Sequence, residues 1–330
     1  MLKGIYILDP GAFRDIYGDA EREDIGRLVD IYAPQQTRET IAKSPLILRD
    51  AEIIFSGWGA PLMDENFLAA VPRLKAVFYG AGSLKGVVTD AFWKRGALIT
   101  SAYAANAVPV AEYTLSQILF CLKCGWQFVQ AIKRDGKYTR GITAHGAYGS
   151  IVGIISLGAT GRRVCQMLKM FDLKVLAYDP HVSPQVAAEL NVALCSLEEI
   201  FRRADVVSLH TPWLPETEGM IAGIHFASMK SNAAFINTAR GAVVREDEMV
   251  KALQQRPDIQ AVLDVTYPEP PPAGSPLYTL PNVILTPHIA GSMGNECRRM
   301  GRYMADELRR YLNGEPLHWT ISRQQAEIMA

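Results

Sequence analysis

The stretch IVGIISLGATGRRVCQMLKMFDLKVLAYD, residues 151 to 179, decides the fold. It contains a short apolar run rich in β-branched residues, a turn with Gly158 and Gly161, a helical pattern and a second apolar run that ends at Asp179. A short β-branched run is typical of a parallel strand that is buried on both faces. The two glycines allow a tight turn into a helix whose first amides can bind a pyrophosphate. A carboxylate roughly 20 residues further on can accept hydrogen bonds from ribose hydroxyls, so this order predicts a nucleotide-binding βαβ unit.

One position departs from the dinucleotide pattern G-x-G-x-x-G, because Ser156 stands where the first glycine would be. The remaining G-x-x-G spacing also occurs in ordinary βαβ crossovers, where small residues serve only the packing of the helix against the strand. The flanking apolar runs and Asp179 favour nucleotide binding over that alternative.

Composition restricts the partners more than the fold. The chain has 330 residues, of which 34 are Lys or Arg and 34 are Asp or Glu, so its formal net charge is zero. Average apolar and charged content at this length predicts two globular domains. A balanced charge provides no basic field for nucleic acid or for an anionic membrane surface, so we expect small molecules or proteins as partners.

The five cysteines are scattered and odd in number, which argues against a disulfide framework and favours a reducing compartment. Cys121 and Cys124 form a C-x-x-C pair, but no second pair follows at zinc-site spacing, and both lie in an apolar helical stretch. We interpret them as core residues and predict no metal site. The apolar run before Asp9 is too short for a signal peptide, and no segment approaches the ~20 apolar residues of a membrane span. We therefore expect a cytoplasmic protein.

Short apolar segments alternate with helical patterns along the chain, which predicts parallel sheets with helices on both faces. A helix is expected from Val110 to Phe128, beginning after Pro109, and another over residues 296–312. The fold class is therefore α/β with two doubly wound parallel sheets. The predicted strands fall into two series: residues 4–8, 28–32, 52–55, 75–79 and 97–100, and then 151–157, 174–178, 205–209, 233–237, 260–264 and 283–286.

Polar residues follow three of the predicted strands, at the end where a doubly wound sheet binds its ligands. Arg240 follows residues 233–237, Glu269 follows the strand that ends at Asp264, and His288 follows residues 283–286. Alone, each has an ordinary alternative as a surface arginine, a solvated loop acid or a histidine bonded to backbone. Together, and downstream of a nucleotide motif, they indicate a catalytic site.

Five motifs follow one another along the chain: the glycine turn with Asp179, LHTPWLPET at 209–217, NTARG at 237–241, DVTYPEP at 264–270 and TPHIAG at 286–291. With these motifs the chain resembles the D-isomer-specific 2-hydroxyacid dehydrogenases over nearly its whole length. The resemblance implies an NAD-binding Rossmann domain at residues 105–291 and a discontinuous, flavodoxin-like substrate-binding domain at residues 1–104 and 292–330. It also implies a homodimer built partly on the crossing helix from Val110 to Phe128.

The resemblance also assigns roles to individual residues. Asp264 would lie near the nicotinamide carboxamide, although a role in capping a loop amide is an alternative. The expected catalytic residues are Arg240, Glu269 and His288. The backbone of Gly80, Ala81 and Gly82 would bind the substrate carboxylate, together with Arg240 and His288. The expected cofactor-binding residues are Gly158, Ala159, Thr160, Gly161, Asp179, His210, Thr211, Thr238 and Asp264.

These residue types suit the reduction of a small 2-keto acid to a D-2-hydroxy acid, and the reverse reaction. A nicotinamide supplies the hydride. The protein must supply a proton for the developing alkoxide and a positive group for the carboxylate and the carbonyl oxygen. His288 can give the proton as a general acid, which typically contributes about 10² to 10⁴ in rate. Glu269, if it is hydrogen-bonded to His288, stabilises the imidazolium. Arg240 presents a permanently charged fork for the carboxylate and the carbonyl oxygen.

Other functions and several details remain open from the sequence. An NAD-sensing binding protein or corepressor could share this architecture without significant turnover, because fold does not fix function. The three intact catalytic residue types favour an enzyme, and Glu269 argues against a formate dehydrogenase, whose histidine pairs with a glutamine. The natural substrate is not identified, because selectivity for its side chain depends on loop geometry. The substrate-side contacts are also open, since Ser83, Leu84, Lys85 and Gly86 stand where many members have Asp and Asn. Lys85 is either a substrate contact or a solvated lysine, and Trp58 is either a pocket wall or a packing residue.

Overall fold

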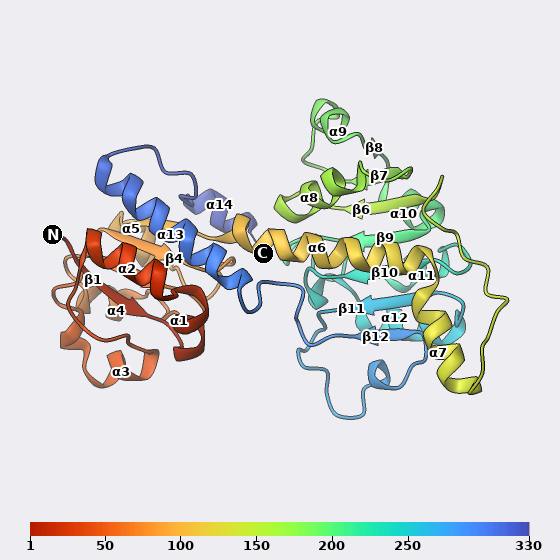
Figure 1. The fold of residues 1–330 in the computed structure, drawn as a ribbon, viewed down its shortest axis with the longest axis horizontal. Coiled ribbons are helices and arrows are strands. Elements are labelled where there is room, and N and C mark those ends of the chain that lie inside the picture. Colours follow the sequence, from red (N-terminus) through yellow and green to blue (C-terminus); the bar gives the residue numbers. More distant parts are fainter. Residues whose placement is uncertain (330) are drawn as a thin grey trace. The chain divides into compact units, whose positions relative to one another are not determined.

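The computed structural model describes residues 1–329, which form two compact units. Unit 1 consists of Met1–Asn106 and the segment that begins at Ser292, and unit 2 consists of Ala107–Gly291. Each unit contains one parallel sheet with helices on both faces, so the predicted fold class is confirmed (Figure 1).

The sheet of unit 1 has the strand order β2-β1-β3-β4-β5, which is the flavodoxin-like doubly wound order. Helices α1, α2 and α13 cover one face of this sheet, and α4 and α5 cover the other. The strands are β1 (Lys3–Ile7), β2 (Asp30–Ile31), β3 (Ile53–Ser56), β4 (Ala76–Tyr79) and β5 (Leu98–Ser101). The helices are α1 (Pro10–Ile16), α2 (Asp19–Leu28), α3 (Arg38–Lys43), η1 (Pro45–Leu48), α4 (Glu65–Ala70), α5 (Asp90–Arg95), α13 (Glu296–Asn313) and α14 (Arg323–Ile328).

The sheet of unit 2 has the order β12-β11-β10-β9-β6-β7-β8, which is the six-strand Rossmann order with one further strand at the β12 edge. The strands are β6 (Ile151–Ile155), β7 (Lys174–Tyr178), β8 (Ala193–Leu194), β9 (Val206–Leu209), β10 (Ala234–Asn237), β11 (Gln260–Leu263) and β12 (Val283–Leu285). The helices are α7 (Gly125–Asp135), α8 (Ala159–Leu168), α9 (Pro184–Leu190), α10 (Leu197–Arg203), α11 (Gly223–Ala227), η2 (Gly241–Val243), α12 (Glu246–Gln255) and η3 (Pro276–Tyr278).

The predicted helix from Val110 to Phe128 was wrong at both its start and its continuity. Helix α6 begins at Tyr103, contains Pro109 and ends at Leu122. Proline lacks the amide of the helical ladder, but seven residues into a helix of 20 it interrupts only one such bond. The helical conformation is then interrupted at Cys124, whose left-handed φ of 50° separates α6 from α7. The predicted helix over residues 296–312 is confirmed as α13.

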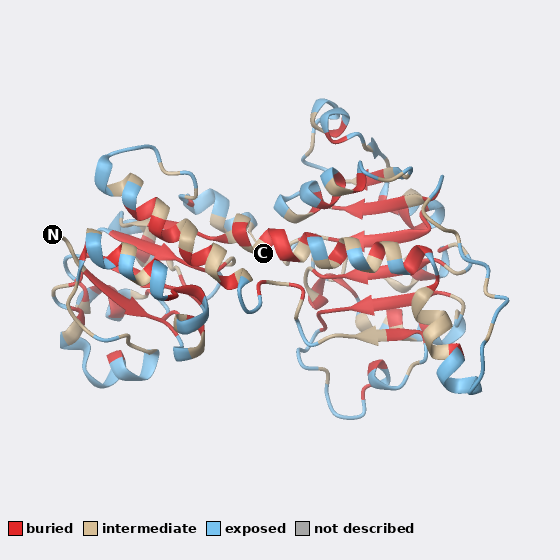
Figure 2. Cartoon of the chain, in the orientation of Figure 1, coloured by how far each residue is buried: buried red, intermediate tan, exposed pale blue. Residues whose placement is uncertain are grey.

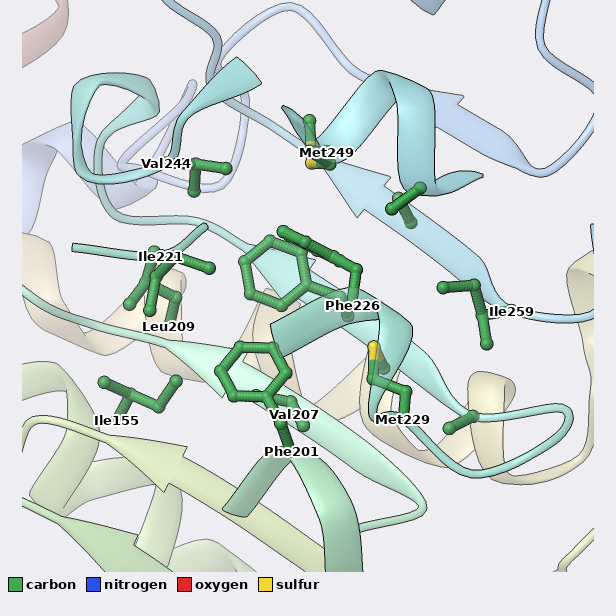
Figure 3. Close-up of a cluster of buried hydrophobic side chains, with 14 of the residues drawn as sticks. Ile155, Phe201, Val207, Leu209, Ile221, Phe226, Met229, Val244, Met249 and Ile259 are labelled. Carbon is green, nitrogen blue, oxygen red and sulfur yellow. The ribbon is translucent and has the colours of Figure 1, made fainter. Parts of the chain in front are cut away.

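The cores lie on the two faces of each sheet. Figure 2 shows the central strands of both sheets as continuously buried. In unit 2, α6 and α8 cover one face, and α10, α11 and α12 cover the other. The second face is centred on aromatic residues (Figure 3), where the rings of Phe201 and Phe226 are 5.9 Å apart and both are fully buried. Cys121 and Cys124 are buried as expected, and all five cysteines are free.

Within residues 1–329, no helix is long and apolar enough to cross a membrane. The same residues contain no group of three or more His, Cys, Asp or Glu side chains that could hold a metal ion.

Candidate active site

The glycine turn after β6 brings the backbone close to the start of α8. Strand β6 ends at Ile155, two residues earlier than predicted, because Ser156 adopts a left-handed φ of 74°. Gly161 is required by packing, since a Cβ there would lie 2.1 Å from the carbonyl oxygen of Ser156. Gly158 is exposed, and a Cβ there would meet no atom within 4 Å. The turn thus has a tightly packed inner side and an open outer side.

The open side fits a dinucleotide pyrophosphate. Gly158 is the N-cap of α8, and Ala159 and Thr160 are its first two residues. The first amides of a helix have no carbonyl partner inside the helix and lie at the positive end of its dipole. An anion can approach the bare α-carbon of Gly158 closely enough to accept hydrogen bonds from these amides. Ala159 and Thr160 therefore stay candidate cofactor contacts.

Asp179 follows β7 and its carboxylate is held by two backbone amides. Oδ2 accepts from the amide of Leu157 at 2.7 Å, and Oδ1 accepts from the amide of His181 at 2.8 Å. These bonds fix the carboxylate beside the glycine turn. An ionised carboxylate has about four acceptor sites, so two remain for ribose hydroxyls.

His210 and Thr211, which follow β9, lie next to the same turn. The hydroxyls of Thr211 and Ser156 are 2.8 Å apart, which links the end of β9 to the end of β6 across the point where the strand order reverses. His210 lies 3.0 Å from the Ser208 hydroxyl through Nε2. Burial lowers the pKa of His210 to about 4, so its imidazole is neutral at physiological pH. A neutral His210 is poorly suited to act as a proton donor.

Glu269 and His288 form a hydrogen-bonded pair beyond the ends of β11 and β12. Nδ1 of His288 lies 2.7 Å from Oε1 of Glu269, and both side chains are about half exposed. An ionised carboxylate only accepts, so Nδ1 carries a hydrogen and Nε2 is the nitrogen left to exchange a proton with a ligand. His288 has a left-handed φ of 55°, an uncommon backbone conformation for a histidine.

Asp264 holds the loop that carries His288. It is 2% exposed, and its carboxylate accepts from the amides of Ile289 and Ala290 at 2.9 Å each and from the Thr286 hydroxyl at 2.6 Å. The amide of His288 donates to the carbonyl of Asp264 at 2.9 Å. Asp264 therefore has the loop-capping role, and its contact with a nicotinamide stays a prediction.

Arg240 lies beyond β10 in a neighbouring loop. Its Nη1 donates to the carbonyl of Ala239 at 2.6 Å, and its own carbonyl accepts from Nδ2 of Asn237 at 3.0 Å. Burial lowers the pKa of Arg240, whereas the charge of Glu269 opposes this shift. Arginine does not lose its proton in proteins near neutral pH, so the guanidinium keeps its charge. Thr238, in the same loop, is buried and its hydroxyl is 3.0 Å from that of Thr114.

Gly80, Ala81 and Gly82 follow β4 in unit 1. The hydroxyl oxygen of Ser101 lies 2.9 and 2.6 Å from the carbonyl oxygens of Ala81 and Gly82, which share its single hydrogen. In a trans peptide the following amide points the opposite way, so the amides of Gly82 and Ser83 are directed away from Ser101. This orientation suits the predicted backbone cradle. Trp58, after β3, is 40% exposed, and Lys85 lies in the exposed part of the loop after Gly82.

Two residues of α6 that no sequence motif indicated hold these loops. The hydroxyl of Tyr113 lies 3.0 Å from that of Thr286, and Thr114 makes the contact with Thr238 described above. The only signal was their position directly after the segment NAVPVAE at residues 106–112.

Comparison with known proteins also indicates a nucleotide-binding domain in the middle of the chain. Residues 116–290 match the NAD binding domain of D-isomer specific 2-hydroxyacid dehydrogenases. D-3-phosphoglycerate dehydrogenase of Mycobacterium tuberculosis is 35% identical over 257 residues, covering 78% of this chain and 48% of that protein. The enzyme of the same name from Methanocaldococcus jannaschii is 29% identical over 303 residues, covering 90% and 57%. The chain spans about half the length of the curated relatives it matches.

A solved structure extends the similarity to both units. D-lactate dehydrogenase with NAD⁺ from Lactobacillus jensenii superimposes with a TM-score of 0.79 at 25% identity, covering 97% of this chain and 100% of that chain.

Proposed function

The chain belongs to the D-isomer specific 2-hydroxyacid dehydrogenase family, and we propose that it reduces a small 2-keto acid to the D-2-hydroxy acid with NADH and catalyses the reverse oxidation. The observation that carries this proposal is the hydrogen bond of 2.7 Å between Glu269 and His288. The pair lies at the carboxyl ends of strands in the same sheet as the glycine turn, where a doubly wound sheet binds its ligands.

Each catalytic residue has one task in this proposal. Bound NADH supplies the hydride to C2 of the keto acid. His288 gives the proton on Nε2 to the developing alkoxide, and Glu269 stabilises the imidazolium through Nδ1. Arg240 binds the carboxylate and the C2 oxygen, and its attraction grows as negative charge develops on that oxygen.

In unit 1, the amides that follow Ala81 and Gly82, those of Gly82 and Ser83, are proposed ligands of the substrate carboxylate. The support is the orientation of these two peptide groups, whose carbonyls share a hydrogen bond from the hydroxyl of Ser101. A carboxylate accepts such amides well, because a hydrogen bond to a charged group is worth about 1.5–3 kcal/mol.

The test of the reaction is NADH oxidation with a panel of 2-keto acids: glyoxylate, pyruvate, hydroxypyruvate, phenylpyruvate, branched acids and the 2-keto form of 3-phosphoglycerate. We expect His288→Asn to lower kcat by about 10² or more, since it removes the general acid. Arg240→Ala should raise KM and lower kcat together. His318→Asn, in unit 1, is the matched control and should leave both constants unchanged. Absence of turnover with every acid would instead favour a binding protein of the same fold.

Asp179 is proposed to select NADH over NADPH. Two charge-assisted bonds to the ribose hydroxyls at about 1.5 kcal/mol each come to roughly 3 kcal/mol, which is on the order of a hundredfold in affinity. A 2′-phosphate would instead be repelled by the carboxylate. Asp179→Ala should therefore reduce the preference, whereas the exposed Asp172→Ala should not. Equal catalytic efficiency of wild type with both cofactors would contradict the assignment.

We also propose a homodimer through α6 and α7. Support comes from Phe120, which is 39% exposed on α6 and packs edge-on against Trp126 with a ring-centroid distance of 4.9 Å. Ile132 on α7 is 36% exposed. Analytical ultracentrifugation should give a dimer for wild type and a monomer for Phe120→Glu. A monomeric wild type at micromolar concentration would refute the assignment.

A further inference from the structure

Two consecutive residues of α6 reach two different loops of the candidate active site. Tyr113 contacts Thr286, two residues before His288, and Thr114 contacts Thr238, two residues before Arg240. We propose that Tyr113 and Thr114 are positioning residues. From one helix, they fix the loops that carry the proton donor and the anion-binding arginine. The proposal rests on the function proposed above, and both residues act through others rather than by touching the substrate.

The contact of Tyr113 has a defined direction. The hydroxyl of Thr286 has a single hydrogen, which it donates to the carboxylate of Asp264 at 2.6 Å. Thr286 must therefore accept from Tyr113. Burial raises the pKa of Tyr113, and the charge of Asp264 adds to the rise, so the phenol remains a donor at neutral and moderately alkaline pH.

This chain of donors stabilises the loop in which His288 has its left-handed backbone. It runs from α6 through Thr286 to Asp264, whose carboxylate also binds the amides of the two residues after His288. Loss of the Tyr113 hydroxyl leaves Thr286 free to rotate, and Asp264 then loses a fixed donor. The direction of the His288 imidazole would become less well defined while its chemistry stays intact.

The contact of Thr114 holds the other loop at its first residue. Thr114 is 0% exposed and Thr238 is 8% exposed, so water does not readily replace this bond. Asn237, the last residue of β10, also holds this loop, because its side chain accepts from the amide of Ala239 at 3.0 Å and donates to the carbonyl of Arg240 at 3.0 Å. Thr114 therefore affects the guanidinium position, and has no contact with the His288 loop among the hydrogen bonds of residues 1–329.

The two contacts predict different kinetic effects from neighbouring positions. Tyr113→Phe should lower kcat for keto-acid reduction about fivefold, with KM for the keto acid and Kd for NADH unchanged, since one neutral hydrogen bond is worth about that factor. Thr114→Val should raise KM about fivefold with a smaller effect on kcat. Ser116→Ala is the matched control, because the Ser116 hydroxyl donates only to a carbonyl of its own helix, that of Tyr113, at 2.6 Å. It should change neither constant.

A second variant separates positioning from general stability. In a His288→Asn background, Tyr113→Phe should have no further effect on kcat, because the group it positions is gone. An equal fivefold loss in that background would overturn the proposal. The proposal would also be overturned if Tyr113→Phe and Thr114→Val both lowered the melting temperature while the first did not act mainly on kcat and the second mainly on KM.

An activity-independent measurement distinguishes failure of this proposal from failure of the proposed function. The ring signals of His288, followed by NMR in protein with labelled histidine, should shift in Tyr113→Phe and stay in place in Thr114→Val and Ser116→Ala. If wild type reduces no keto acid but this pattern appears, the positioning role stands and the proposed reaction is wrong. If Tyr113→Phe leaves the His288 signals unchanged, the positioning role is wrong whatever the activity.

Discussion

Replacing Gly161 with alanine tests the close packing of the nucleotide turn. The new Cβ would lie 2.1 Å from the carbonyl oxygen of Ser156, whereas ordinary contact begins at about 3.4 Å. The obstacle is backbone, so no side-chain rotation relieves it. The turn or the first turn of α8 must move by roughly 1 Å, and that movement also separates the hydroxyls of Ser156 and Thr211, now 2.8 Å apart.

The magnitude follows from three contributions. Overpacking of this severity costs about 3 kcal/mol, and loss of the hydroxyl pair costs about 1 kcal/mol. Alanine is favoured over glycine inside a helix by roughly 0.5–1 kcal/mol, which offsets part of the loss. The net destabilisation of Gly161→Ala is therefore about 3 kcal/mol. For a unit of this size it lowers the melting temperature by about 6–12 °C.

Gly158→Ala is the matched comparison in the same turn. Gly158 has φ −71°, and a Cβ there meets nothing within 4 Å, so alanine should leave the melting temperature within about 1 °C of wild type. The added methyl group would cover the open side of the turn and raise the Kd for NADH. Scanning calorimetry and NADH fluorescence titration measure the two effects separately. A Gly161→Ala protein as stable as wild type would refute the packing argument, and unchanged NADH affinity in Gly158→Ala would refute the pyrophosphate assignment.

Three further outcomes follow from burial. The pKa of His210 lies at about 4, below the ~6.5 of a free histidine, so the unfolded chain binds the extra proton between these values and stability falls as pH drops from about 6.5 to 4. Urea titrations at several pH values should show that the free energy of unfolding of His210→Asn falls less steeply with decreasing pH than that of wild type, by up to about 1.4 kcal/mol per pH unit. Parallel plots of unfolding free energy against pH for the two proteins would contradict this. Phe226→Ala, in the fully buried cluster of Figure 3, should cost about 3–5 kcal/mol, and a loss below about 1 kcal/mol would show that the site collapses freely. Burial raises the pKa of Cys121 to about 12, so mass spectrometry after iodoacetamide treatment at pH 8 should find the less buried Cys195 alkylated first.

The strands were predictable because short apolar runs between turn residues are a local signal. Both sheet orders follow the doubly wound patterns expected from that alternation. Strand β8 was not predicted, because two residues, Ala193 and Leu194, carry no period. The end of α6 was also missed. An apolar helical pattern continues across Cys124, and the residue with the left-handed conformation that stops the helix is this cysteine, with Gly125 one position later.

The candidate site was predictable where its residues follow strands directly. Arg240, Glu269 and His288 come from adjacent strand ends, and parallel strands bring such ends to one edge. The supports of the site were not predictable in the same way. Tyr113 and Thr286 are 173 positions apart, and their hydroxyl contact depends on how α6 crosses the sheet. A Tyr-Thr pair in a helix has no pattern that distinguishes such a contact from ordinary surface polarity.

The division of unit 1 into two chain segments has a consequence for synthesis on the ribosome. One face of its sheet packs against Met300, Met304 and Leu308 of α13, which lie in the same buried cluster as Phe55 and Phe78. About 200 residues separate the end of the first segment, Asn106, from Leu308. At roughly 5–20 residues per second, the nascent first segment waits about 10–40 s for this helix, and until then α1 and α2 alone cover that face of the sheet. Unit 2 is continuous in sequence and can fold during that interval, so unit 1 becomes complete only after unit 2 has been synthesised, although its first segment precedes unit 2 in the chain.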